Sequence, residues 1–215
     1  MGKYSLTVKG TLRTCFGRHV GTREDILGAA ARIMRTEGYA RATTKEIARA
    51  AGYSEAALYK HFQDKTEIFL RVLEEQLPEL AELLARLEAG EGEVRANLEQ
   101  VVATAVAFYA DSFPIAVSLY SSRALLVAHR ERVRELGGGP RMPEEVLARY
   151  LAAEQLLGRL APSADPRAMA RLLLGACFQQ AFLADFAGAP LDAEQRAELA
   201  RSLVATVLGA TAGAG

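Results

Sequence analysis

Basic, hydroxyl-bearing and aromatic side chains lie close together between residues 43 and 65, in the run TTKEIARAAGYSEAALYKHFQDK. Cationic side chains can neutralise phosphate charge, and hydroxyl groups can donate hydrogen bonds to phosphate oxygens. This mixture is typical of contact with nucleic acid. We predict that five side chains position the phosphate backbone: Thr44, Lys45, Tyr59, His61 and Lys65.

Other side chains in the same run could contact base edges or thymine methyl groups in a major groove. The predicted contacts are Tyr53, Glu55, Ala56 and Lys60, and Ser54 completes the DNA-binding set. Glu55 has two interpretations. A carboxylate repels phosphate but can accept a hydrogen bond from cytosine N4, whereas an acidic residue in a first helical turn can also simply favour the helix dipole.

Two short crossing helices are predicted to carry these side chains. Thr43 and Glu46 have the spacing of a capping box, which marks a helix start. Gly52 can adopt the positive φ that ends a helix, and Ser54 can cap the next helix. Helices separated by so few residues cross, which leaves the second free to enter a major groove.

The run 43–54, followed by Leu58-Tyr59-Lys60-His61-Phe62 and by Asp64-Lys65, resembles the helix-turn-helix of the tetracycline-repressor-like (TetR/AcrR) transcription regulators. The segment 22–39 is similar to the first helix of that family. The resemblance covers residues 22–75, about a quarter of the chain. It departs from the family pattern at Glu55, where a basic or small residue is frequent, and at Ala56, where glycine is frequent.

The resemblance implies an all-α protein with a three-helix DNA-binding head and a helical body for ligand binding and dimerisation, about nine helices in total. We expect a basic N-terminal extension over residues 1–21, the helix-turn-helix domain over 22–68 and the ligand-binding and dimerisation domain over 69–215. The extension could be a disordered leader or an arm that reaches along DNA.

Charge is distributed unevenly, although the 215-residue chain has a formal net charge of zero. Residues 1–65 contain 12 Lys and Arg against 6 Asp and Glu, whereas residues 66–215 contain 14 against 20. Phosphate neutralisation needs local positive charge. We therefore expect the first part to meet DNA and the acidic remainder to face away from it.

Beyond Lys65, Leu, Ala, Arg and Glu dominate, and apolar positions recur at helical spacing. A connecting helix begins there, with Pro78 either kinking it or being a packing irregularity. Breaks predict further helices over 93–111, 114–136, 143–161, 166–187 and 192–209. The segment 169–186 has an apolar surface too wide for one core-facing stripe. The resemblance implies a homodimer through helices 166–187 and 192–209.

A small-molecule site is expected between the head and the dimer helices, where aromatic bulk is combined with a few polar groups. The predicted ligand-binding residues are Phe108, Tyr109, Phe113, Tyr120, Arg123, Tyr150, Phe178 and Gln179. Each taken singly could instead belong to the core or the surface.

Neither catalysis nor a metal site is indicated by the sequence. The three histidines lie in separate contexts, and the two cysteines have no metal-like spacing. We expect no enzyme activity, no cofactor, no membrane span and a cytoplasmic location.

The predicted function is that of a ligand-responsive transcription repressor, which binds palindromic double-stranded operator DNA as a homodimer and is released by a small apolar or amphipathic effector. The alternatives are a DNA-binding regulator that has no effector or acts as an activator, and a helical protein-interaction module.

Overall fold

The structure, a computed structural model, describes residues 21–75, 79–135 and 139–212. Within these ranges every regular element is a helix, as predicted, but there are ten helices rather than about nine. They are α1 (Thr22–Arg41), α2 (Thr44–Ala51), α3 (Glu55–Leu58), α4 (Lys65–Glu75), α5 (Glu79–Ala85), α6 (Val94–Ser121), α7 (Arg123–Glu135), α8 (Met142–Leu156), α9 (Pro166–Ala187) and α10 (Ala193–Ala212).

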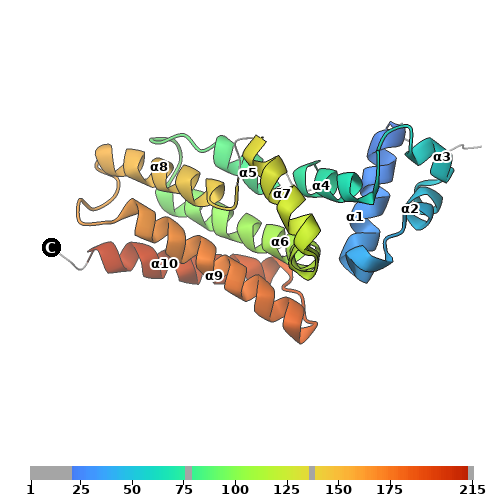
Figure 1. Cartoon of the computed structure of the whole chain (residues 1–215). Helices are drawn as coiled ribbons and strands as arrows, with labels where there is room; N and C mark the ends of the chain where they lie inside the picture. The colour runs from blue at the N-terminus through green and yellow to red at the C-terminus, as the bar shows by residue number, and fades with distance from the viewer. Residues whose placement is uncertain (1–20, 76–78, 136–138, 213–215) are drawn as a thin grey trace, which may run out of the picture.

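The molecule is elongated, with α1, α2 and α3 at one end and a bundle of long helices at the other (Figure 1). We call α1–α3 the head and α5–α10 the body; α4 leads from one to the other. In the body, α6 contacts both α9 and α10, and α8 packs on α9. The head thus combines one long helix, α1, with two short ones, α2 and α3, whereas long helices make up most of the body.

Two clusters of buried apolar side chains hold these parts together. The body core joins α5, α6, α8, α9 and α10, with Leu98, Leu147 and Leu173 fully buried. The head core is formed by α1 to α4 around Ile26, Leu58 and Phe69, but it also takes in Ile115, Leu119 and Leu125 from α6 and α7. The first half of α6 therefore belongs to one core and its second half to the other.

Continuity of α6 corrects the predicted break at residues 112–114, because the helix runs through Pro114 without interruption. Proline inside a helix removes one backbone hydrogen bond and costs about 3 kcal/mol. Eight buried apolar residues on both sides of Pro114, from Val94 to Leu119, offset that cost by packing into the two cores. Tertiary packing, rather than local helix propensity, therefore keeps this segment helical.

A buried polar network ties the α5–α6 loop to the end of α8. Glu154 is fully buried, and its Oε1 accepts a hydrogen bond from the Gly90 amide at 3.3 Å. Its Oε2 lies 3.3 Å from Arg159 Nε, in the geometry of an ion pair rather than of a hydrogen bond. Asn97 Nδ2 donates to Tyr150 Oη at 2.9 Å, and burial raises the pKa of Tyr150 to about 12. These contacts place Tyr150 at the far end of the body from the head.

Some predictions lie outside the described residues. These are the N-terminal extension up to residue 20, Cys15 within it, and the kink at Pro78. The other cysteine, Cys177, is buried in the body core, where burial raises the pKa of its thiol to about 12.

One helix among the described residues, α6, is long and apolar enough to cross a membrane by length and composition alone. Its contacts with α1, α5, α9 and α10 are those of a helix at the centre of a folded protein. We therefore interpret α6 as the core helix of the body.

Candidate nucleic-acid interface

Local hydrogen bonds hold the two helices of the predicted helix-turn-helix. The Glu46 amide donates to Thr43 Oγ1 at 3.2 Å, and Glu46 Oε2 accepts from the Thr43 amide at 3.2 Å, which completes the predicted capping box. The hydrogen bond from the Thr43 hydroxyl, then that from its amide, lowers the pKa of Glu46. Both residues therefore fix the start of α2.

The turn between α2 and α3 depends on Gly52 and Ser54. Gly52 has φ 82°, a left-handed conformation that side-chain-bearing residues rarely adopt, and its amide donates to the last carbonyls of α2. Ser54 Oγ then accepts from the Ala57 amide at 3.2 Å and caps α3. The hydroxyl of Ser54, one of the predicted DNA contacts, is thus used within the turn.

Burial divides α3 and the residues after it into an inner and an outer side. Leu58 and Phe62 are buried in the head core, at 0% and 2% exposure. On the outer side, Tyr59 is 51% exposed. The exposed predicted DNA contacts are Lys45, Ser54, Ala56, Tyr59, Lys60 and His61. The structure thus gives α3 and the residues after it an anchored side and an exposed side, and the exposed side carries the positive charge of Lys60.

Three predicted residues meet where α2 and α3 begin. Thr44 Oγ1 donates to Glu55 Oε1 at 2.6 Å, and Tyr59 Oη lies 3.3 Å from the same hydroxyl oxygen. The sequence pattern placed these side chains on one surface, but it did not indicate that they bond to one another.

Tyr53 and Lys65 are more enclosed than the sequence analysis implied. Tyr53 is half-buried, and its hydroxyl donates to Asp25 Oδ2 on α1 at 2.8 Å, which holds it against the head rather than toward a groove. The ammonium group of Lys65 lies 4.0 Å from the centre of the Tyr39 ring, and burial lowers its pKa. Lys65 therefore belongs to a junction between α1 and α4 as well as to the head surface.

Sequence reasoning missed two residues of this junction, Tyr39 and Arg23. The Tyr39 amide donates to Ser118 Oγ on α6 at 3.4 Å, and its ring packs edge-on against Phe69 with centroids 4.9 Å apart. Arg23 makes two 2.7 Å hydrogen bonds to Glu75, which raises the pKa of Arg23 and lowers that of Glu75. Neither pairing has a sequence signal, because the partners are 79 and 52 residues apart.

The predicted ligand-binding residues separate into groups. Four aromatic side chains from α6 and α9 form a continuous edge-to-face series: Tyr109 lies 5.3 Å from Phe108 and 5.6 Å from Phe178, and Phe113 lies 5.9 Å from Phe178. Burial raises the pKa of Tyr109 to about 12. Gln179 is exposed on α9 beside this series.

Tyr120, Arg123 and Tyr150 do not join that group. Tyr120 is 78% exposed near the end of α6, Arg123 is exposed at the start of α7, and Tyr150 is in the Glu154 network.

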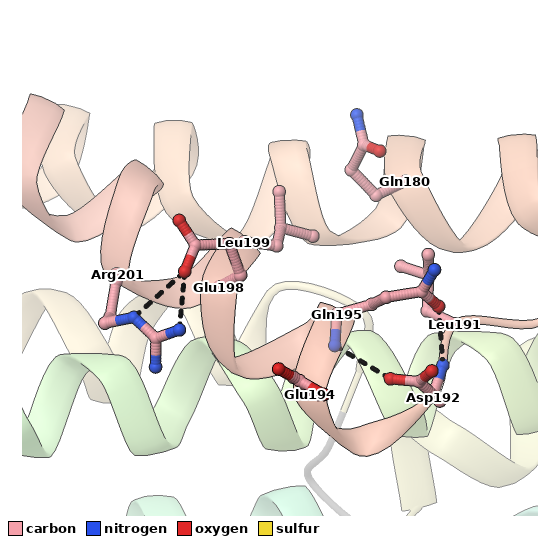
Figure 2. Close-up of a pocket in the computed structure, with 8 residues that line it drawn as sticks. All are labelled: Gln180, Leu191, Asp192, Glu194, Gln195, Glu198, Leu199 and Arg201. Carbon is pink, nitrogen blue, oxygen red and sulfur yellow. Dashed lines mark hydrogen bonds and ion pairs between the residues drawn. The ribbon is translucent and has the colours of Figure 1, made fainter.

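An open cleft of about 520 Å³ lies between α9 and the start of α10 and contains none of the predicted ligand-binding residues (Figure 2). Most of its lining residues are of polar or charged type: Gln180, Leu191, Asp192, Glu194, Gln195, Glu198, Leu199 and Arg201. Asp192 and Gln195 hydrogen-bond to each other's backbone amides, so part of this lining serves to cap α10. Within the described residues, no group of three or more His, Cys, Asp or Glu could hold a metal ion.

Residues 26–72, which include α2, the glycine turn and α3, match the model of the bacterial regulatory proteins of the tetR family. This segment belongs to the tetR family. It is also 33% identical over 127 residues to the nucleoid occlusion factor SlmA of Vibrio atlanticus (strain LGP32), an alignment that covers 55% of this chain and 62% of that protein. The chain thus aligns with less than two thirds of the length of this relative.

Solved structures of known regulators share the fold of this protein. SmeT, the repressor of the Stenotrophomonas maltophilia multidrug efflux pump SmeDEF, superposes with a TM-score of 0.61 at 23% identity, covering 86% of this chain and 89% of SmeT. Bacillus subtilis FadR in complex with stearoyl-CoA gives a TM-score of 0.63 at 15% identity and covers 86% and 97%. At such low sequence identity, these similarities show a shared fold alone.

Proposed function

We propose that this protein is a transcription repressor that binds palindromic operator DNA in the cytoplasm as a homodimer and releases it when a small apolar or amphipathic molecule binds the body. In this proposal residues 22–68 bind DNA, and residues 69–215 bind the effector and the second copy. One observation carries it: buried Leu58 and Phe62 anchor α3 and the residues after it in the head core, while Tyr59, Lys60 and His61 are exposed on the other side. That is the arrangement a groove-reading helix needs.

Homodimerisation is supported by the exposed side of α9. Five large apolar side chains there are 41–82% exposed: Leu172, Phe178, Phe182, Leu183 and Phe186. Solvated apolar surface on this scale favours burial against a partner. A second copy related by two-fold symmetry would cover both faces at once and present two heads to an inverted repeat.

Effector control is supported by α6. Its aromatic residues Phe108, Tyr109 and Phe113 precede Ile115 and Leu119, which are part of the head core. A molecule inserted among those rings would displace the same helix on which the head is seated. By linkage, an effector that favours the displaced arrangement weakens DNA binding by the same factor.

Apolar or amphipathic chemistry for the effector is suggested by proteins of the same fold. SmeT is known in complex with triclosan, and Bacillus subtilis FadR with stearoyl-CoA. An aromatic series such as Tyr109–Phe178–Phe113 suits molecules of that kind, since apolar contact supplies most of the binding free energy of such sites.

DNA binding is tested by titrating promoter DNA with the full chain across a salt series. Since counterion release makes affinity salt-dependent, we expect a steep decrease with salt and a smaller slope for Lys60→Ala. Arg95→Ala, an exposed cation at the far end of the body, is the matched control and should leave the slope unchanged. Weak binding that does not respond to salt would favour a helical protein-interaction module instead.

A second candidate is a DNA-bound nucleoid occlusion factor, which the 33% identity with the Vibrio atlanticus protein favours. Such a factor would occupy many sites along the chromosome, whereas a repressor would occupy few sites at promoters. Chromatin immunoprecipitation followed by sequencing separates the two. Transcript levels in a deletion strain then distinguish repression, which predicts a rise for genes beside the bound sites, from activation.

A further inference from the structure

An acidic residue lies within the basic surface that we assign to DNA. Glu55 is the first residue of α3, and the predicted DNA contacts around it include Lys45, Lys60 and His61. A carboxylate facing phosphates would oppose binding, since like charges repel. The Glu55 carboxylate must therefore either lie away from the DNA or meet a hydrogen-bond donor on it.

Hydrogen bonds hold the Glu55 carboxylate in one place. Its Oε1 accepts the Thr44 hydroxyl at 2.6 Å. A hydroxyl has a single proton, so Thr44 Oγ1 is left as the acceptor in its 3.3 Å contact with Tyr59 Oη. The chain therefore runs from the Tyr59 hydroxyl to Thr44 and on to Glu55. A carboxylate has about four lone-pair sites, so one bond to Thr44 leaves capacity for a further donor.

We infer that Glu55 reads a cytosine in the major groove, with Thr44 as the residue that positions it; this inference rests on the proposed operator binding. A carboxylate only accepts hydrogen bonds. Guanine presents two acceptors in the major groove and thymine presents one acceptor with a methyl group. Adenine places its N7 acceptor beside its N6 donor, whereas cytosine presents the N4 donor without that neighbour. Cytosine is therefore the base that fits a fixed carboxylate.

This assignment predicts a G·C pair, with its cytosine at the start of α3, in each half of the operator. Replacing that pair should weaken binding by the wild-type chain about tenfold, the usual discrimination of one good base contact. Glu55→Ala should bind both versions equally, and it should bind unrelated DNA more tightly than the wild type because a repulsive charge is gone. Glu55→Gln should shift the preference toward adenine, the base that an amide group pairs with.

The experiment is selection of binding sites from random duplex DNA by the full-length wild-type chain and by Glu55→Ala, Glu55→Gln and Thr44→Val. The expected result is loss of one cytosine preference per half-site in Glu55→Ala, a change to adenine in Glu55→Gln, and a weakened cytosine preference in Thr44→Val. The control is Glu37→Gln, which removes the same charge from an exposed position on α1 and should leave the selected sequence unchanged.

Melting temperatures show whether each variant is folded, and the selected sequences decide the assignment. If Glu55 only stabilises the start of α3, Glu55→Ala lowers the melting temperature but selects the wild-type sequence, and the assignment is wrong. A wild-type chain that binds DNA with a steep salt slope but selects no cytosine also overturns it while leaving the proposed function intact. A wild-type chain that binds no duplex overturns both.

Discussion

The head and the body reach their folds by different kinds of contact. In the head, α2 and α3 are set by bonds between near neighbours: Thr43 with Glu46, and Ser54 with Ala57. In the body, the decisive contacts join distant segments, such as Glu154 with the Gly90 amide, 64 residues apart. Short-range contacts can be recognised in a sequence, whereas long-range ones depend on the assembled fold.

The difference between the head and the body is tested most directly by truncating one buried side chain in each core. Leu58 and Leu147 are both fully buried, so replacing either with alanine should cost about 2–5 kcal/mol in the free energy of unfolding. Urea denaturation measures both losses. Only Leu58→Ala should also abolish binding of promoter DNA under conditions where the variant is still folded, because Leu58 anchors α3. Equal loss of DNA binding in Leu147→Ala would show that DNA binding depends on the body core as much as on the head core.

The buried ion pair of the body gives the next largest effect. Arg159→Ala leaves the Glu154 carboxylate buried without its cation, at a cost of about 3 kcal/mol. Thermal unfolding should show this loss, while Arg149→Ala, an exposed arginine on α8, should change little. A double variant with Glu154→Gln should recover part of the stability, since the unpaired charge is then absent. Failure to recover any would mean that Arg159 acts through its hydrogen bond to the Gly92 carbonyl.

A smaller effect is expected at the start of α2. Thr43→Ala removes the N-cap and should cost about 1 kcal/mol. The capping bonds also lower the pKa of Glu46 below its ordinary value of 4.5. Their stabilisation is therefore present above pH 4.5 and is lost as the pH falls through the folded-state pKa. Between the two pKa values Thr43→Ala should unfold with a weaker pH dependence than the wild type, as measured by circular dichroism. An unchanged pH dependence would contradict the role of Glu46 in the cap.

The smallest effect is expected for the ion pair between α8 and α9. Arg171 Nε lies 2.7 Å from Glu144 Oε1, but the arginine side chain is 56% exposed. Water screens such a pair, so Arg171→Ala should cost about 0.5 kcal/mol or less. A double-mutant cycle with Glu144→Ala isolates the interaction. A coupling free energy above 1 kcal/mol would mean that long-range polar contacts in the body matter even at its surface.

The sequence was sufficient to predict the all-helical fold, the capping box of α2 and the glycine turn, because each depends on residues a few positions apart. It was insufficient at Pro114, where a proline in α6 suggested a break and tertiary packing kept the helix continuous. The 11-residue separation of Thr44 and Glu55 likewise hid their hydrogen bond, since only the crossing of α2 and α3 brings them together. The aromatic residues of α6 and α9 were predicted as a group, but Tyr150 could be placed apart from them only from the assembled body.

The passage of α6 through both cores has a consequence for building chimeric regulators. A head exchanged at residue 68 would leave Ile115, Leu119 and Leu125 behind in the donor chain. These side chains share one core with Ile26, Leu58 and Phe62 of the head, so the transplanted head would meet the recipient's residues instead. The graft would then join two mismatched surfaces. A working hybrid has to carry the second half of α6 and the start of α7 along with its DNA-reading module, so the unit of exchange is discontinuous in the chain.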